Sequence, residues 1–279
     1  FYKKHTLSGD LNYSRNSMHY YGFNDTIKKD NGSAYKQYFQ LFEGKVRLQS
    51  HYNDTSKKIN HDIRLNYYNY GDHYNTYENN VFASGLFRAI VDNQKFTVLA
   101  SADYYNVQAT HDTVNNILVK VNPYFELGGK KWNAGIGPNI TLDYFTSIGA
   151  KYYIAPCFNV HYDVYQNIII PYAGLDGGVN KNSYRSLSTT NPFVLSNLPY
   201  KNTNNVYNAF VGLRGAISSN LSYDVKALYG RYNNMVYFLA DYNANADNLF
   251  ANRYEVIYMN TNYINVNAQI KYQYKEKLN

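Results

Sequence analysis

The stretch Ile264–Lys275, INVNAQIKYQYK, decides the fold. Its even-numbered residues, ending at Tyr274, are apolar or aromatic, and its odd-numbered residues are amide or basic. A strict period of two indicates a β-strand with two unlike faces. A tilted strand needs about 9–11 residues to cross a bilayer, with aromatic side chains at the interface. The stretch is long enough and turns aromatic towards one end, so it predicts a membrane-spanning strand.

The composition favours the same interpretation. The chain of 279 residues contains 34 Tyr and 14 Phe but 6 Pro, which favours strands and suits membrane interfaces. Mean hydropathy is −0.54, and no stretch approaches about 18 consecutive apolar residues, which excludes membrane-spanning helices. The net charge of +7 is spread over single Lys and Arg residues, which argues against nucleic acid and suits lipopolysaccharide at least as well. Cys157 is the one cysteine and permits no internal disulfide.

The same alternation recurs along the chain and predicts about 12 strands. They are expected at 4–14, 35–52, 61–74, 80–91, 96–108, 117–127, 132–145, 150–165, 168–181, 205–217, 221–238 and 253–275. The shorter connections are 54–59, 92–95, 128–131, 166–167 and 218–220, and the longer ones include 24–33, 109–116, 182–204 and 239–252. Outer-membrane barrels keep short turns in the periplasm and long loops outside, so both termini are expected to be periplasmic. The predicted fold is a single all-β domain over 1–279, an antiparallel transmembrane β-barrel, and the alternative that it is part of a larger barrel stays open.

Four hairpins test the alternation, because the turn length fixes which residues face one another. The predicted outward pairs are Val91–Phe96 and Ala89–Val98, Leu127–Trp132 and Phe125–Ala134, Val160–Ala173 and Phe158–Leu175, and Leu213–Val225 and Val211–Ala227. In the last hairpin, Ile217 closes the turn opposite Leu221. The same register places Arg214 opposite Asp224 on the inner face, which predicts an ion pair in the lumen.

Alternation also assigns side chains to the two sides of the barrel. The charges predicted to face the lumen are Glu43, Lys45, Arg47, Arg64, Arg88, Asp103, Lys120, Glu126, Asp143, Asp163, Asp176, Arg214, Asp224, Lys226 and Lys271. The side chains predicted to face lipid include Val160, Ile169, Ile264, Val266 and Ile270, and those of the interface girdle are Trp132, Tyr272 and Tyr274. Because both signs of charge are interspersed, we expect the lumen charges to pair with one another. A selective pathway would instead show a ring of one sign.

The sequence contains two Tyr-rich runs, Asn16–Gly22 (NSMHYYG) and Asn66–Gly71 (NYYNYG), that are similar to runs in a known class of membrane protein. Together with the long strands they resemble outer-membrane barrels of the Bacteroidota type, which are often described as TonB-dependent-receptor-like. The resemblance implies the outer membrane of a Gram-negative bacterium and a receptor or transport role. The sequence departs from what that family leads us to expect in three ways: neither a plug-like segment nor an energy-coupling box is recognisable before the first strand, fewer strands are predicted than such receptors usually have, and the end, KEKLN (275–279), lacks an aromatic residue.

Three functions remain open at this point. The first is a receptor or transport barrel that takes up a solute through loops 182–204 and 239–252. The second is a non-transporting scaffold or accessory subunit of an outer-membrane complex for assembly, secretion or uptake, which the missing plug and the mixed-charge lumen favour. The third is a soluble β-sandwich or secreted enzyme, which would have to hide its Tyr-rich apolar face.

The sequence contains no motif for a cofactor, a metal or catalysis. The neighbouring pairs at 72–73 (Asp-His) and 111–112 (His-Asp) are the candidates for catalysis near the outer rim, and we interpret them as polar loop or lumen residues. Enzymatic activity and cofactors are therefore not expected. The expected partners are outer-membrane lipid, lipopolysaccharide and other outer-membrane proteins of a complex.

Overall fold

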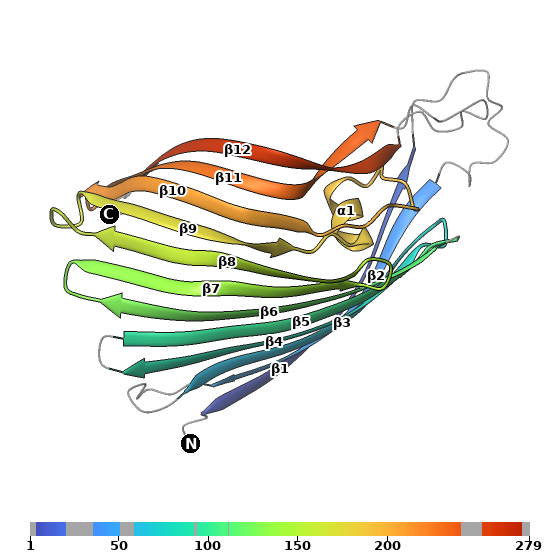
Figure 1. Ribbon diagram of the computed structural model, residues 1–279, viewed down its shortest axis with the longest axis horizontal. Coiled ribbons are helices and arrows are strands. Elements are labelled where there is room, and N and C mark those ends of the chain that lie inside the picture. Colours follow the sequence, from blue (N-terminus) through green and yellow to red (C-terminus); the bar gives the residue numbers. More distant parts are fainter. Residues whose placement is uncertain are drawn as a thin grey trace, which may run out of the picture.

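The chain folds into one 12-stranded antiparallel sheet in which the strands follow one another in sequence order, from β1 to β12 (Figure 1). The computed structural model describes residues 4–20, 36–50, 59–91, 94–110, 112–240 and 253–274. The strands are β1 (His5–His19), β2 (Lys36–Ser50), β3 (Asn60–Asp72), β4 (Tyr77–Val91), β5 (Gln94–Gln108), β6 (Thr113–Gly128), β7 (Trp132–Phe145), β8 (Gly149–Tyr162), β9 (Ile170–Asn180), β10 (Thr203–Ser218), β11 (Leu221–Ala240) and β12 (Tyr254–Tyr272). Each predicted strand overlaps an observed one, so the all-β prediction is confirmed.

The sheet curves strongly but does not close. Within the described residues, β1 pairs with β2 alone and β12 pairs with β11 alone, so each keeps one free edge. One short helix, α1 (Tyr184–Thr190), lies between β9 and β10. No helix in the described part of the chain has the length and apolar character needed to cross a membrane.

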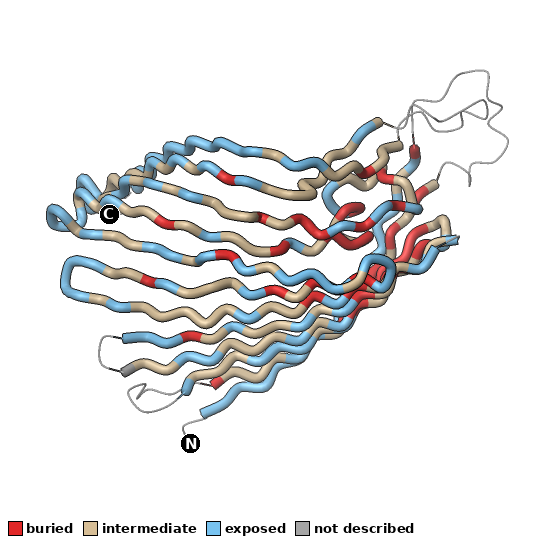
Figure 2. Tube along the Cα trace, viewed as in Figure 1, coloured by how far each residue is buried: buried red, intermediate tan, exposed pale blue. Residues whose placement is uncertain are grey.

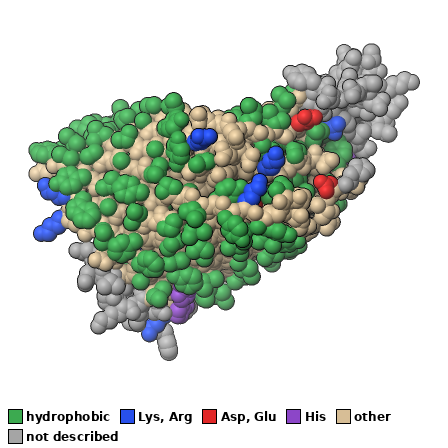
Figure 3. Space-filling model, in the orientation of Figure 1, with side chains coloured by type: hydrophobic (Ala, Val, Ile, Leu, Met, Phe, Trp, Pro, Cys, Tyr) green, Lys and Arg blue, Asp and Glu red, His purple; other side chains and the backbone are tan. Residues whose placement is uncertain are grey.

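The two faces of the sheet differ as the alternation predicts. We call the face that α1 packs against the inner face, and the opposite face the outer face. Over residues 264–272 of β12 both faces are exposed, and they differ in chemistry: Ile264, Val266 and Ile270 lie on the outer face, and the residues that alternate with them, on the inner face, are amide or basic. Hydrophobic side chains are spread widely over the face seen in Figure 3, and charged side chains on it are few. This broad apolar surface suits the hydrocarbon core of a bilayer, and the contact of these side chains with lipid stays a prediction.

Two of the four predicted hairpin registers are confirmed. Across β8 and β9, Phe158 lies opposite Leu175, and the adjacent outward pair follows the same register. Across β10 and β11, Leu213 lies opposite Val225, and the neighbouring outward pair also matches. The predicted closure of that last turn is wrong in detail. Ser218, not Ile217, lies opposite Leu221, because a register shift between 216 and 218 places a bulge at the end of β10.

The other two registers are wrong by two residues. Ala89 lies opposite Phe96 rather than Val98, because the turn between β4 and β5 is two residues shorter than predicted. Leu127 lies opposite Ala134 rather than Trp132, because the turn between β6 and β7 starts one residue later. A shift of two residues leaves every side chain on its predicted face, because the side-chain period of a strand is two. The face assignment therefore survives both errors.

Residues 181–202, which we call the cap segment, contain α1 and pack on the inner face at the end of the sheet with the longer connections. Buried residues concentrate at this end (Figure 2). The residues of the shared hydrophobic cluster are Phe39, Leu41, Tyr68, Tyr70, Tyr105, Val107, Phe145 and Val256 of the strands, with Tyr184, Leu187, Val194, Leu198 and Tyr200 of the cap segment. The sequence predicted this stretch as an external loop, and the structure corrects that prediction: it folds inward because its apolar side chains are buried there.

The cap segment also connects distant parts of the sheet. Its helix packs beside Phe39 and Tyr70 on β2 and β3. Further along, Val194 forms a parallel bridge with Tyr254 at the start of β12, and the Tyr254 backbone exchanges two hydrogen bonds of 3.0 Å with 193 and 195. Strands near the two edges of the sheet are thus held by one 22-residue segment, 181–202, that lies between them.

The unlike faces of β12 give a test in the membrane. We expect Val266→Arg to lower the free energy of unfolding by about 2–4 kcal/mol, because it places a guanidinium in the hydrocarbon core. Asn267→Arg, one residue further on and facing inward, should cost clearly less. Urea titration of both variants in lipid vesicles compares them, and equal costs would contradict the assignment of the two faces.

Candidate functional site

The cap segment is anchored to the sheet by buried carboxylates, of which Asp72 is the most connected. Asp72 ends β3 and is 1% exposed. It accepts hydrogen bonds from the Tyr184 hydroxyl (2.6 Å) and from the Ser196 hydroxyl, both in the cap segment. It also accepts the backbone N–H groups of Tyr74 (2.9 Å) and Thr76 (2.8 Å). One carboxylate therefore orders the β3–β4 turn and fixes the cap segment against it.

A second anchor joins α1 to β2, β3 and β4. Glu78 is fully buried and accepts the Arg185 backbone N–H at 2.6 Å and the Tyr68 hydroxyl at 2.5 Å. The Arg185 guanidinium lies 3.2 Å from Glu43 and 4.2 Å from the centre of the Tyr68 ring. These contacts satisfy both buried carboxylates, which would otherwise be costly to bury.

The two ends of the cap segment are held as well. Lys181 forms an ion pair with Asp103 of β5 at 2.8 Å. Asn202 donates a hydrogen bond of 2.9 Å to Asp143 of β7, which also accepts the Asn116 amide at 2.7 Å. Anchors at the start, the helix and the end define one closed arrangement of the segment inside the curved sheet.

The Tyr184 hydroxyl stays protonated in this arrangement. Burial raises the pKa of Tyr184 well above its ordinary value of 10.0, and the neighbouring Asp72 carboxylate raises it further. A protonated phenol is the donor that the Asp72 carboxylate needs. The contact is therefore stable over the whole neutral range.

Inner-face charges predicted to pair do so near the end of β2 and the start of β3. Arg47 and Arg64 both bind Asp62, each at 2.7 Å. Arg88, also predicted on this face, instead donates a hydrogen bond of 3.3 Å to Thr97. Glu43 also pairs with Lys45 at 2.8 Å, so the expectation of paired lumen charges holds for part of the predicted set and fails for Arg88.

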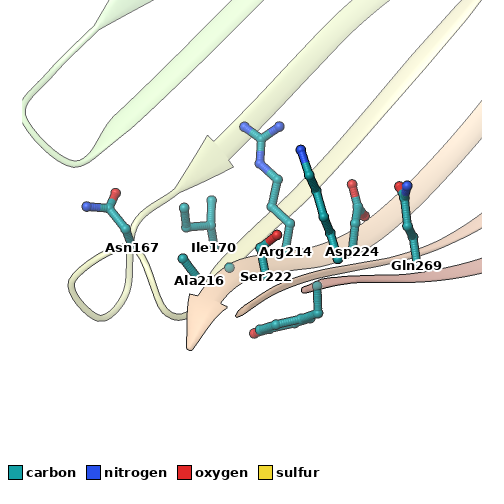
Figure 4. A pocket seen from close by; sticks show the side chains of 10 residues that line it. Asn167, Ile170, Arg214, Ala216, Ser222, Asp224 and Gln269 are labelled. Carbon is teal, nitrogen blue, oxygen red and sulfur yellow. The ribbon is translucent and has the colours of Figure 1, made fainter. Parts of the chain in front are cut away.

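The predicted lumen residues Arg214, Asp224 and Lys271 come together at the turn end of β10, β11 and β12. They line a hollow of about 390 Å³, and Figure 4 shows the Arg214 and Asp224 side chains on the same side of the strands. Arg214 lies directly opposite Asp224, as predicted from the register. Among the ion pairs of the described residues, however, none joins the two. Asp224 accepts the Tyr172 hydroxyl at 2.6 Å, and the Arg214 guanidinium lies 5.4 Å from the centre of the Tyr172 ring.

The remaining predicted site residues lie apart from one another. The Lys226 ammonium lies 4.2 Å from the centre of the Phe210 ring. Asp163 follows the end of β8 and accepts the Asn167 backbone N–H at 2.9 Å, so it orders a turn. Trp132 begins β7 with 41% of its side chain exposed, on the outer face as the girdle prediction requires. Whether the predicted girdle and lipid-facing side chains contact the membrane stays a prediction.

Catalytic and metal-binding candidates gain no geometric support. Asp72 serves the cap segment, and His111 lies outside the described residues. In the described ranges, no three His, Cys, Asp or Glu side chains come close enough together to hold a metal ion.

Sequence reasoning missed the cap segment and its anchors. The available local signals were the spacing of Tyr184 and Leu187 on one side of a helical turn and the serines at 183 and 186. The Ser183 backbone N–H donates a hydrogen bond of 2.8 Å to the Ser186 hydroxyl at the start of α1. Such a signal can suggest a helix start but says nothing of where the helix packs.

Comparisons with known proteins support the fold. No family model and no curated protein matches the sequence. Among solved structures, the FrpB iron transporter from Neisseria meningitidis is similar, with a TM-score of 0.69 and 7% identity over 98% of this chain and 48% of that chain. The siderophore receptor PirA from Pseudomonas aeruginosa has a TM-score of 0.57 and 10% identity over 84% of this chain and 46% of that chain. FpvA from P. aeruginosa, bound to a pyoverdine and iron, has a TM-score of 0.56 and 11% identity over 97% of this chain and 45% of that chain.

At such identities the likeness concerns the fold alone. The antiparallel sheet has the strand arrangement of these outer-membrane barrels, which confirms the predicted all-β fold and agrees with the predicted localisation, although the sheet of this chain is not closed. The neighbours carry the names of receptors and transporters. The chain spans less than half the length of each of these three proteins. The Bacteroidota type stays a prediction.

The anchoring role of Asp72 can be measured by hydrogen exchange. Asp72→Ala leaves the Tyr184 and Ser196 hydroxyls without their acceptor, and a buried unsatisfied group costs about 1–3 kcal/mol. We expect amide exchange across 184–198 to accelerate by about tenfold or more, since about 1.4 kcal/mol corresponds to a factor of ten. Asp10→Ala, on the exposed edge strand β1, is the control. Equal exchange in both variants would contradict the role of Asp72.

The raised pKa of Tyr184 predicts a dependence on alkaline pH. When the cap segment opens, Tyr184 can ionise near its ordinary pKa of about 10, whereas the buried hydroxyl holds its proton. The closed arrangement is therefore fully stable below about pH 10 and loses stability as the pH rises further. Cleavage of the cap segment by an alkaline-tolerant protease, normalised to an unfolded peptide, should accelerate above this pH. Tyr184→Phe should weaken the pH dependence, and an unchanged profile would contradict the assignment.

Proposed function

We propose that this chain forms the wall of an outer-membrane receptor barrel that takes up a solute, with the cap segment narrowing the path along the inner face. The observation that carries the proposal is the position of residues 181–202, which lie on the polar inner face and are held there by Asp72 and Glu78. The contacts that hold this segment are separate from the pairing of the strands, so the segment can open without unfolding the sheet, as gating segments do.

The comparisons with solved structures support the general class of function and not a particular solute. Proteins with this fold include an iron transporter and a siderophore receptor. The mixed-charge inner face and polar hollows are compatible with passage of a hydrophilic solute. Ligand capture by the loop 239–252 remains part of the proposal, and most of this loop lies outside the described residues.

We propose further that the sheet belongs to a larger barrel. In a bilayer the free edges of β1 and β12 would leave backbone N–H and C=O groups unpaired, which costs several kcal/mol per group. The similar structures are about twice as long as the share of them that this chain matches, and the chain covers 48% of FrpB. Strands beyond the 12 described here would pair both edges.

Conductance in planar bilayers tests the gating role of the cap segment. Because the sheet keeps two free edges, the recording uses the full-length barrel in which both edges are paired, and this barrel should show little steady conductance while the cap segment narrows the path. Replacing 184–198 by a short Gly-Ser linker should produce a large, stable, ohmic conductance. Far-UV circular dichroism checks that the variant keeps its strands, and Asp72→Asn offers a milder opening without a deletion.

Two results would contradict the proposal. A wild-type protein with a large ohmic conductance would show that the cap segment does not close the path. A protein that stays closed after both changes would favour the role of a non-transporting accessory subunit in an outer-membrane complex.

A further inference from the structure

A second polar hollow lies on the inner face among β5 to β10, next to the ends of the cap segment. Its volume is about 430 Å³, within the usual range of small-molecule sites, about 300–1,000 Å³. We call it the vestibule. Its lining is rich in amide and hydroxyl side chains, including Asn122, Asn139, Thr141, Asn180, Asn205 and Asn208. Amides and hydroxyls both donate and accept hydrogen bonds, as the hydroxyls of a sugar do.

Asn205 suggests that the vestibule is a binding site and not only a surface hollow. Its side chain is 8% exposed, and its Oδ1 atom is buried with no hydrogen-bond partner. A buried acceptor without a donor is costly, and rotation of the Asn205 amide would bring its oxygen to the vestibule, where a ligand hydroxyl can satisfy it.

The backbone around Asn205 is irregular. The register of β10 shifts after Asn205 relative to both β9 and β11. Bulges of this kind re-aim side chains and are common next to functional sites. The opposing residue on β9 is Gly178, and the neighbouring Gly177 has backbone oxygens of 205 and 206 where a Cβ would lie. A larger residue at 177 would push the two strands apart at the vestibule.

Lys120 supplies a positive charge to the same hollow. It lies between Ser101 and Thr141 on the neighbouring strands, and its side chain is half-buried. Within the described residues, its ammonium takes part in no ion pair or hydrogen bond, whereas Lys181 nearby is bound to Asp103 at 2.8 Å. Lys120 is thus available to an anionic group that enters the vestibule.

Asp176 limits how much negative charge the vestibule can accept. Its exposed carboxylate lines the same hollow. A doubly charged anion such as a phosphate monoester would be repelled more strongly than a single carboxylate. Lys120 and Asp176 together therefore favour one carboxylate over a group of higher charge.

We propose that the vestibule binds a hydroxyl-rich carboxylate of the sugar-acid class. The carboxylate contacts Lys120, and the Asn205 amide rotates so that a ligand hydroxyl donates to its Oδ1 atom. This inference rests on the proposed function, because it names the class of solute that passes the cap segment. Binding to the purified protein is nevertheless independent of conduction, so either proposal can fail while the other stands.

Cys157 provides a direct probe of occupancy. It is the one cysteine of the chain and lines the vestibule. Alkylation by iodoacetamide is followed by mass spectrometry of the full-length protein in detergent, with increasing D-glucuronate. We expect D-glucuronate to slow alkylation at least fivefold at saturation, with a matching heat of binding in titration calorimetry. D-glucose and glucose 6-phosphate should protect much less.

Matched variants assign the effect to the vestibule. Lys120→Met and Asn205→Leu should each weaken the protection by D-glucuronate at least tenfold. Lys226→Met and Asn267→Leu make the same changes on the inner face away from the vestibule and should leave it unaltered. Added salt should weaken binding to the wild type.

Several outcomes would overturn the inference. One is the absence of protection and heat with D-glucuronate. Another is protection by D-glucose equal to that by D-glucuronate, because Lys120 would then contribute no binding to the carboxylate. A third is equal loss in the vestibule variants and in their controls. Far-UV circular dichroism and alkylation of each variant without ligand separate loss of binding from loss of folding.

Discussion

The structure depends on one constraint: backbone N–H and C=O groups that lie in hydrocarbon have to be paired within the protein. Each unpaired group costs several kcal/mol, so strands that cross a bilayer need a neighbour on both sides. The order β1 to β12 provides this for every described strand except at the two edges. The alternation of side chains follows from the same geometry, because a paired strand has to direct its side chains in turn to lipid and to the interior. Irregular backbone is tolerated only away from lipid, and the cap segment lies on the inner face.

The position of the cap segment is specified by the strands as much as by the segment itself. Asp72 and Glu78 are buried carboxylates whose set of hydrogen-bond donors is complete only when Tyr184, Ser196 and the Arg185 backbone are in place. Removing either side of such a contact costs more than the contact contributes, since a buried charge is then left uncompensated. The segment also touches β2 and β3 at one edge and β12 at the other. We therefore infer that it fixes the curvature of the sheet as well as the width of the interior.

The sequence was sufficient for the strands and their faces but not for the cap segment. Alternation is a local signal, and it located all 12 strands, including the decisive run in β12. The register of two hairpins was wrong by two residues, because a shift of two leaves apolar residues opposite apolar residues and so goes undetected by pattern matching. The Tyr184–Asp72 contact joins residues 112 positions apart, and the sequence around either residue does not predict its contact with the other. Similarly, the helix of the cap segment is only seven residues long, from Tyr184 to Thr190, which is too short to show periodicity.

The Arg214–Asp224 pair shows why correct register does not by itself give a correct contact. The two residues are directly opposed, but Gly212, two positions before Arg214, has no side chain, and the ring of Tyr172 occupies the space where its Cβ would lie. From there the Tyr172 hydroxyl reaches Asp224, and its ring offers its face to the Arg214 guanidinium. A water-exposed ion pair is worth about 1 kcal/mol or less, so a charge-assisted hydrogen bond and a cation–π contact are sufficient to replace it. Cross-strand opposition limits the possible partners, and the side chain on the adjacent strand selects among them. The glycine that admits an aromatic ring therefore determines whether the charges at this end of the inner face neutralise one another or stay accessible to a solute.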